Sequence, residues 1–125
     1  ELVGIWDLVD ESGWIIDNKF YSKTPSQTEL DRDIQMSFYS LAYRLMFGEV
    51  ERGIRIDAVI KTKNKKAIQL TTNRTSEELQ WTAKLITQVA DAMESGLHYP
   101  NPSGWWCDPR FCNAWDNCQH GAMNA

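Results

Sequence analysis

The stretch that decides the fold is GIWDLVDESGWIIDNKF, at residues 4–20. Two runs rich in apolar and β-prone residues, 4–10 and 14–20, flank a short polar segment that ends in glycine. This pattern is typical of a β-hairpin whose three-residue loop holds glycine in the left-handed conformation. The loop also predicts the register, in which residues 10, 9, 8 and 7 pair with residues 14, 15, 16 and 17.

This register brings two carboxylates together. Opposite residues of an antiparallel pair share a face, so Asp7 and Asp17 should face each other. Lys19 follows on the same face, because side chains repeat every two residues along a strand. At about 5 Å and an effective dielectric near 20, the two carboxylates would repel by on the order of 3 kcal/mol, and the apolar neighbours Ile5 and Ile15 would limit screening by water.

A divalent cation between Asp7 and Asp17 would turn this repulsion into binding energy, since hard cations prefer oxygen ligands. Lys19 beside them could bind an anion or steady a hydroxide. The alternative is that one of the two aspartates is a solvated residue at a strand edge. A slip of one residue in the loop would place the two carboxylates on opposite faces of the sheet.

Composition bounds the class of protein. A chain of 125 residues predicts one domain, and a net charge of −4 means that nucleic-acid binding must come from a local patch. No apolar run approaches the roughly 20 residues of a membrane span, so no membrane partner is expected. Three cysteines near the C-terminus favour a metal or cluster site in a reducing compartment such as the cytoplasm.

A helix is expected to begin between Ser26 and Thr28 and to end at Gly48, with a capping box formed by Ser26 and Glu29 or by Thr28 and Asp31. Its apolar residues recur at three- and four-residue spacing and predict a buried stripe. That stripe is Leu30, Ile34, Phe38, Leu41 and Leu45. On an adjacent face, Gln35 and Tyr39 lie one turn apart.

Two strands, 54–62 and 66–71, are predicted next, followed by a helix that Thr75 and Glu78 cap and that stops at Gly96. The core face expected for that helix is Leu79, Ala83, Ile86, Ala90 and Met93. The turn between the strands carries four lysines, Lys61, Lys63, Lys65 and Lys66. They form either a solvated turn or a positive patch for phosphates.

The tail from residue 98 is rich in proline, glycine and tryptophan and carries Cys107, Cys112 and Cys118. A tetrahedral zinc site or a cubane cluster needs four ligands, and the three thiolates supply only three. His120, or a cysteine upstream of Glu1, could supply the fourth ligand. Three unrelated buried cysteines are the alternative.

In order, the segments 4–7, 15–19 and 35–39 resemble three motifs of RecB-type nucleases, in the PD-(D/E)XK or restriction-endonuclease-like superfamily. The resemblance implies that Asp7 and Asp17 bind Mg²⁺ or Mn²⁺, and that Asn18 adds its backbone carbonyl. It implies that Lys19 assists the attacking water. Asn18 stands where an aromatic residue is more usual.

The resemblance also implies that Gln35 and Tyr39 line the DNA side of the catalytic site. The tail is similar to that of the iron–sulfur branch, which includes CRISPR-associated exonucleases and AddB-type helicase–nucleases. There, three C-terminal cysteines and one upstream cysteine hold a 4Fe–4S cluster, with Zn²⁺ as the alternative here. That upstream cysteine, and the family's first helix with its His or Glu, would precede Glu1, so an N-terminally incomplete domain is expected.

The sequence thus predicts an α/β fold, with a mixed β-sheet flanked by helices in a nuclease core at residues 1–97 and a Cys-rich tail at 98–125. The predicted function is metal-dependent hydrolysis of DNA, by resemblance as an exonuclease in repair, recombination or phage/CRISPR processing. A cytoplasmic protein of bacterial, archaeal or phage origin, within a larger recombination or helicase–nuclease assembly, is expected.

Two alternatives stay open. One is a catalytically silent nucleic-acid-binding module with a structural iron–sulfur or zinc site. The other is a small zinc-binding interaction domain built on the three tail cysteines and His120.

Overall fold

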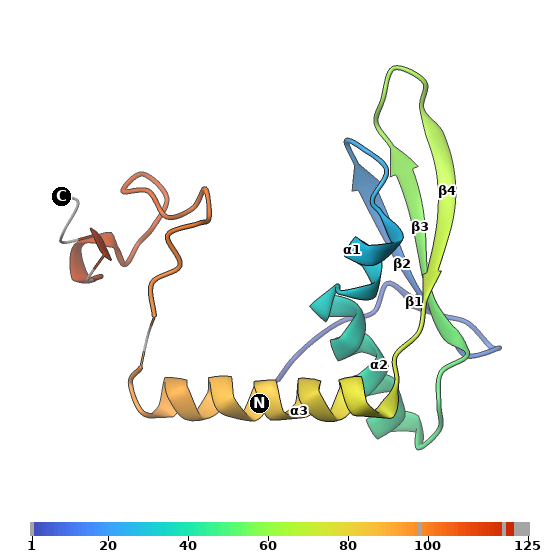
Figure 1. Ribbon diagram of the computed structural model, residues 1–125, viewed down its shortest axis with the longest axis horizontal. Coiled ribbons are helices and arrows are strands. Elements are labelled where there is room, and N and C mark those ends of the chain that lie inside the picture. The colour runs from blue at the N-terminus through green and yellow to red at the C-terminus, as the bar shows by residue number, and fades with distance from the viewer. Residues whose placement is uncertain (1, 98, 119, 122–125) are drawn as a thin grey trace. The chain divides into compact units, whose positions relative to one another are not determined.

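The computed structural model describes residues 2–97, 99–118 and 120–121 (Figure 1). The elements in chain order are β1 (Leu8–Val9), β2 (Trp14–Tyr21), α1 (Gln27–Asp31), α2 (Ile34–Phe47), β3 (Gly53–Ile60), β4 (Lys66–Thr72), α3 (Ser76–Glu94) and the 3-10 helix η1 (Trp115–Asn117). The chain forms two compact units, Glu1–Thr87 and Gln88–Ala125, which are described separately below. Their boundary lies inside α3, whereas the sequence suggested a division after residue 97.

The first unit is built on one four-stranded sheet with the order β1-β2-β3-β4. β2 and β3 run parallel, and the other two pairs are antiparallel, so the sheet is mixed. The hairpin register is the predicted one, with Leu8 opposite Ile16 and Val9 opposite Ile15. Gly13 has a φ of 84°, the left-handed conformation that the three-residue loop requires.

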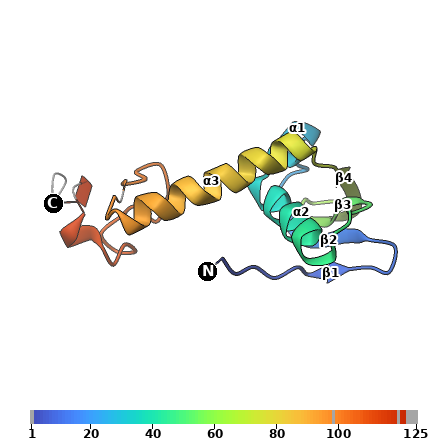
Figure 2. The same ribbon diagram turned by 90° about the horizontal axis from the view of Figure 1, so that it is seen from below.

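One face of this sheet carries the core. α1 and α2 lie on the same side of the sheet (Figure 2), and the buried residues there are Ile15, Leu30, Met36, Tyr43, Ile54, Ile56, Ala58 and Ile60. Burying each such isoleucine contributes about 1.5–3 kcal/mol. Because side chains alternate along β2, Asp17 and Lys19 follow Ile15 on this helix-covered face.

The predicted single helix is in fact two, α1 and α2, with a break at Arg32 and Asp33. The Ser26–Glu29 capping box is present at the start of α1, as predicted. Asp33 then caps α2, because its Oδ1 accepts a hydrogen bond of 2.8 Å from the Gln35 amide. The break places Gln35 in the first turn of a new helix.

The predicted apolar stripe is right at Leu30, which is buried in α1, but wrong for α2, where Ile34 and Leu45 are exposed. The buried residues of this helix are Met36, Ser37, Ser40 and Tyr43, while Leu45 is 76% exposed. The helix turns its two serines inward because each meets a buried polar group, and no hydrophobic pattern can indicate such a pairing. On α3, Leu79 is buried as predicted, but Thr82 is the other buried residue and Ala83 is exposed.

The second unit holds the end of α3, a series of turns and η1. Gly96, with a φ of 70°, follows the helix, as predicted for its C-terminal signal. Trp105 packs edge-on against Trp106 and Phe111. None of the helices in the described part of the chain combines the length and the apolar character needed to cross a membrane.

Candidate active site

The centre of β2 carries a buried carboxylate. Asp17 is only 3% exposed, on the face that α2 covers. Lys19 Nζ lies 2.8 Å from Asp17 Oδ2 and balances its charge. No donor among the described residues is aligned for a hydrogen bond to this buried oxygen. Oδ2 is therefore paired with the Lys19 charge but can still accept a further hydrogen bond or a metal ion.

α2 holds the Lys19 ammonium in place. Lys19 Nζ donates to Gln35 Oε1 at 2.8 Å, and Gln35 Nε2 donates to the Tyr39 hydroxyl at 2.7 Å. Gln35 and Tyr39 face the same way because they lie four residues apart on the helix. The structure therefore joins Asp17, Lys19, Gln35 and Tyr39, four of the predicted catalytic residues, in one chain of polar contacts.

Asp7 meets β2 at the neighbouring peptide. Its Oδ2 accepts a hydrogen bond of 2.8 Å from the Asn18 amide, the nitrogen of the bond that joins Asp17 to Asn18. The Asp7 carboxylate thus occupies the Asn18 N–H, which a backbone carbonyl of β1 would accept if β1 were longer. β1 is accordingly limited to Leu8–Val9. Since the N–H and C=O of a strand residue point to the same neighbour, the Asn18 carbonyl is directed to this side too.

The surroundings of Asp7 differ from the prediction. Ile5 is 81% exposed, so the apolar screening expected around the carboxylates is absent on this side. Asp7 itself is exposed, whereas Asp17 is buried. Trp6, next to Asp7, donates from its indole Nε1 to the Tyr39 carbonyl at 3.4 Å. This contact between the first strand segment and α2 was missed from the sequence, because a lone tryptophan carries no pairing signal.

The charge state of Lys19 follows from its neighbours. Burial opposes its charged form most strongly, but the adjacent Asp17 carboxylate, helped by Tyr21 and Asp33, raises the pKa of Lys19 above its ordinary value. Burial raises the pKa of Tyr21, which is two residues further along the same face. Lys19 is therefore a stable cation at neutral pH.

The donor set at β2 suits a hard divalent cation. It consists of the Asp7 and Asp17 carboxylates and the backbone carbonyl of Asn18, all oxygens, and Mg²⁺ commonly takes one or two carboxylates and fills the rest of its shell with water and phosphate. The buried Asp17 oxygen without an aligned donor is the position at which such a cation would replace a missing partner. The residues present therefore fit the metal that the family resemblance implies.

The remaining predicted residues lie elsewhere. The lysines of the β3–β4 turn, Lys61, Lys63, Lys65 and Lys66, are all exposed. Lys61 Nζ lies 5.0 Å from the centre of the Phe20 ring, a cation–π contact. Four exposed lysines fit both a solvated turn and a positive patch for phosphates, so contact of this turn with DNA stays a prediction.

The tail cysteines Cys107, Cys112 and Cys118 are free thiols and half-buried. Within the described part of the chain, no three His, Cys, Asp or Glu side chains gather as ligands of one metal ion. His120 packs edge-on against Trp115, with ring centres 6.1 Å apart. The tail as described does not form the four-ligand site that a 4Fe–4S cluster or structural zinc needs, and that assignment stays a prediction.

Comparison with known proteins identifies the class. The model of the PD-(D/E)XK nuclease superfamily matches residues 1–119. Because this match covers nearly the whole chain, the protein belongs to the PD-(D/E)XK nuclease superfamily. The mixed sheet with flanking helices is accordingly a restriction-endonuclease-like α/β fold, as predicted.

Among solved structures, the crystal structure named "Putative exonuclease" from Eubacterium rectale is similar, with a TM-score of 0.50 and 14% sequence identity. The similarity covers 92% of this chain and 43% of that one, so this chain spans less than half the length of its structural neighbour. At this identity the likeness supports the fold alone. Among curated proteins, no match is found.

Proposed function

We propose that this chain is the nuclease region of a divalent-metal-dependent deoxyribonuclease that hydrolyses phosphodiester bonds. The observation that carries the proposal is the buried Asp17 oxygen without an aligned donor, beside Lys19 and one peptide away from the Asp7 carboxylate. Asp7, Asp17 and the Asn18 carbonyl would hold Mg²⁺ or Mn²⁺. When bound, the metal lowers the pKa of a coordinated water and offsets charge on the phosphate.

The other residues of the site act through charge and position. Lys19 is a cation held beside the Asp17 carboxylate, so it can neutralise charge that develops on the phosphate. Gln35 fixes the direction of the Lys19 ammonium, and Tyr39 fixes Gln35. This division makes Lys19 the group whose loss should slow the reaction without removing the metal.

Finer features of the function rest on the family resemblance. Exonuclease action, a role in DNA repair, recombination or phage/CRISPR processing, and a place in a larger helicase–nuclease assembly are proposed on this ground. The exposed lysines of the β3–β4 turn would contact the DNA backbone. Each such contact steepens the salt dependence of binding by about one unit of slope.

The test compares Lys19→Ala with Lys84→Ala, an exposed lysine of α3 outside the site. End-labelled linear DNA is incubated with each variant and with the parent chain in Mg²⁺ or Mn²⁺. Lys19→Ala should stay folded, bind metal and lose about 10²–10³-fold in cleavage rate, the typical effect of removing one such electrostatic group. Lys84→Ala should match the parent.

If Lys19→Ala cleaves within a few-fold of the parent, Lys19 has no part in the reaction. If the parent binds neither metal nor DNA, the nuclease proposal itself is wrong. A folded chain that binds DNA and never cleaves it would favour the catalytically silent module.

The tail is tested separately by absorbance and metal analysis of protein purified without oxygen. An iron–sulfur cluster on Cys107, Cys112 and Cys118 would give a brown protein that contains iron and sulfide. A colourless protein that contains zinc would favour the zinc alternative, and one without either metal would remove the cysteines from any metal site.

A further inference from the structure

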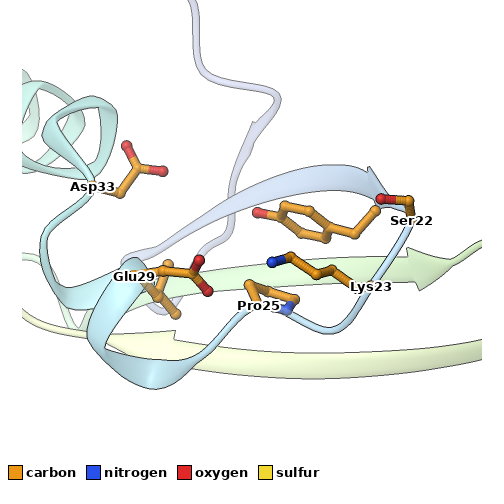
Figure 3. A pocket seen from close by; sticks show the side chains of 7 residues that line it. Ser22, Lys23, Pro25, Glu29 and Asp33 are labelled. Atoms are coloured by element: carbon orange, nitrogen blue, oxygen red, sulfur yellow. The ribbon is translucent and has the colours of Figure 1, made fainter.

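A pocket of about 270 Å³ lies at the end of β2 that follows Lys19 and is not used by the proposed metal chemistry. It is formed by the end of β2, the loop that follows, and α1 up to its junction with α2. Figure 3 shows Lys23 and Glu29 pointing toward each other across this space, with Asp33 at its far end. The volume is just below the range of about 300–1,000 Å³ for pockets that bury drug-sized ligands, so it suits a single ring system.

Two residues of the pocket wall are linked to the catalytic cluster. Tyr21, in its wall, follows Lys19 by two residues and so lies on the same face of β2. Asp33, also in its wall, accepts from the Gln35 amide, and the Gln35 side chain accepts from Lys19. A strand whose phosphate lies at Lys19 would therefore have its next base within reach of the pocket.

The walls suit a planar base better than a phosphate. Tyr21 offers a half-buried ring, and Pro25 and the buried Leu30 add apolar surface. The pocket has two carboxylates, those of Glu29 and Asp33, against the single ammonium of Lys23, so its lining is net negative. A phosphate would be repelled, whereas a neutral aromatic ring would stack.

The two carboxylates also give the pocket a hydrogen-bonding preference. Glu29 uses Oε2 to accept from the Ser26 amide at 2.7 Å, and Asp33 uses Oδ1 to accept from the Gln35 amide at 2.8 Å. The second oxygen of each carboxylate can accept a further hydrogen bond. Carboxylates accept hydrogen bonds from amino groups of bases, as in contacts to cytosine N4. Unpaired thymine offers only its N3–H, and the two carbonyl oxygens that flank this donor repel a carboxylate.

We propose that this pocket binds one unpaired nucleobase beside the cleaved phosphate and prefers bases with an exocyclic amino group over thymine. The proposal rests on the proposed nuclease function, since it places the base of that substrate. Stacking on Tyr21 provides affinity that does not depend on base identity, and Glu29 and Asp33 provide the preference.

The experiment moves a single cytosine through an otherwise all-thymine oligonucleotide. Binding and cleavage are measured with the full chain in Mg²⁺ or Mn²⁺ for each position of the cytosine. One position should give about tenfold tighter binding than thymine, the lower part of the range for a good base contact.

The variants Glu29→Gln and Asp33→Asn keep their helix caps, because Gln serves in a capping box and Asn caps as well as Asp. Each replaces an acceptor oxygen with an amide, so the double variant should lose the cytosine preference and retain its thermal stability. Glu78→Gln is the matched control, since Glu78 forms the same capping box with Thr75 outside the pocket. It should keep the full preference.

Equal binding at every cytosine position, or an unchanged preference in the double variant, would overturn the base pocket. If the parent still cleaves DNA in that case, the proposed function stands without it. If the parent binds no oligonucleotide of either composition, both the pocket and the proposed function are wrong.

Discussion

The helix α2 carries a polar cluster at each end, and the two clusters are satisfied to different degrees. Near its C-terminal end, the Glu51 carboxylate is buried at 6% exposure and accepts two hydrogen bonds from Arg44 and one of 2.6 Å from Ser40. Near its N-terminal end, Asp17 is buried as deeply but has only the charge of Lys19 beside Oδ2.

The two clusters differ in whether the buried carboxylate is fully hydrogen-bonded. Arg44 and Glu51 form a bidentate pair, and both oxygens of the buried carboxylate have hydrogen-bond donors. The hydrogen bonds from Arg44 and Ser40 outweigh burial, so the pKa of Glu51 lies below its ordinary value. The Asp17 cluster keeps an acceptor that a further donor or a metal ion can use.

The largest expected effect is a loss of DNA cleavage when the Asp17 cluster, at the N-terminal end of α2, is altered. Asp17→Asn removes the buried charge and should reduce DNA cleavage by about 10³-fold or more, because both a metal ligand and its charge are lost. The unfolding free energy should fall by less than in Glu51→Gln, because Asp17 loses one ion pair without an aligned hydrogen bond, whereas Glu51 loses a bidentate pair. Urea titration and a cleavage assay measure the two quantities. A folded Asp17→Asn variant with parental activity would show that Asp17 is not needed for cleavage.

Substitution in the Arg44–Glu51 cluster should lower stability and leave metal binding unchanged. Glu51→Gln leaves Arg44 without its carboxylate and should lower the unfolding free energy by about 3 kcal/mol. Metal affinity should be unchanged, because Glu51 lies outside the site. The matched control is Glu11→Gln, an exposed glutamate that should be neutral. A destabilisation no greater than that of the control would show that the pair is not structural.

The Arg44–Glu51 pair should also make the stability of the folded state depend on pH in acid. Because the pKa of Glu51 is lowered in the folded state, its contribution is complete above its ordinary value of 4.5 and is lost as pH falls below it toward the folded value. The parent should therefore lose more stability than Glu51→Gln between about pH 5 and pH 3. Urea midpoints across this range test the point, and parallel curves for the two proteins would contradict it.

The smallest expected effects come from two neutral substitutions on the same helix. Gln35→Leu removes the acceptor that directs Lys19 and should slow cleavage by about tenfold, with little change in metal affinity. Ser40→Ala removes one hydrogen bond to Glu51 and should cost about 1 kcal/mol of stability with unchanged activity. If both variants altered activity alike, the two ends of α2 would not be functionally distinct.

The sequence alone predicted those features of the fold that depend on residues close together in the chain. The loop that ends in Gly13 determined the register of β1 and β2, and the register brought Asp7 to the same stretch of β2 as Asp17. The superfamily assignment also followed from ordered motifs and was confirmed by the family match. In both cases the decisive residues are close in sequence.

The rest depended on buried polar contacts between distant residues. Arg74 is 5% exposed and donates to Ser37 and to the carbonyls of Leu30 and Asp33, so it stabilises the break between α1 and α2. An arginine is normally expected at the surface, and nothing in its neighbourhood in the sequence indicates burial. The phase of α2, and with it the identity of its buried face, could not be predicted without this contact.

The most direct test of the account is a thermal unfolding series with Mn²⁺ or Mg²⁺ for the parent, Asp17→Asn and Glu51→Gln. A cation bound only to the folded state stabilises it by about 2.7 kcal/mol at 100 times its Kd, a shift of several degrees in Tm. The parent and Glu51→Gln should gain the same increment from their different starting points, and Asp17→Asn should gain none. An equal metal-induced shift in Asp17→Asn would contradict the claim that the buried oxygen of Asp17 is a metal ligand.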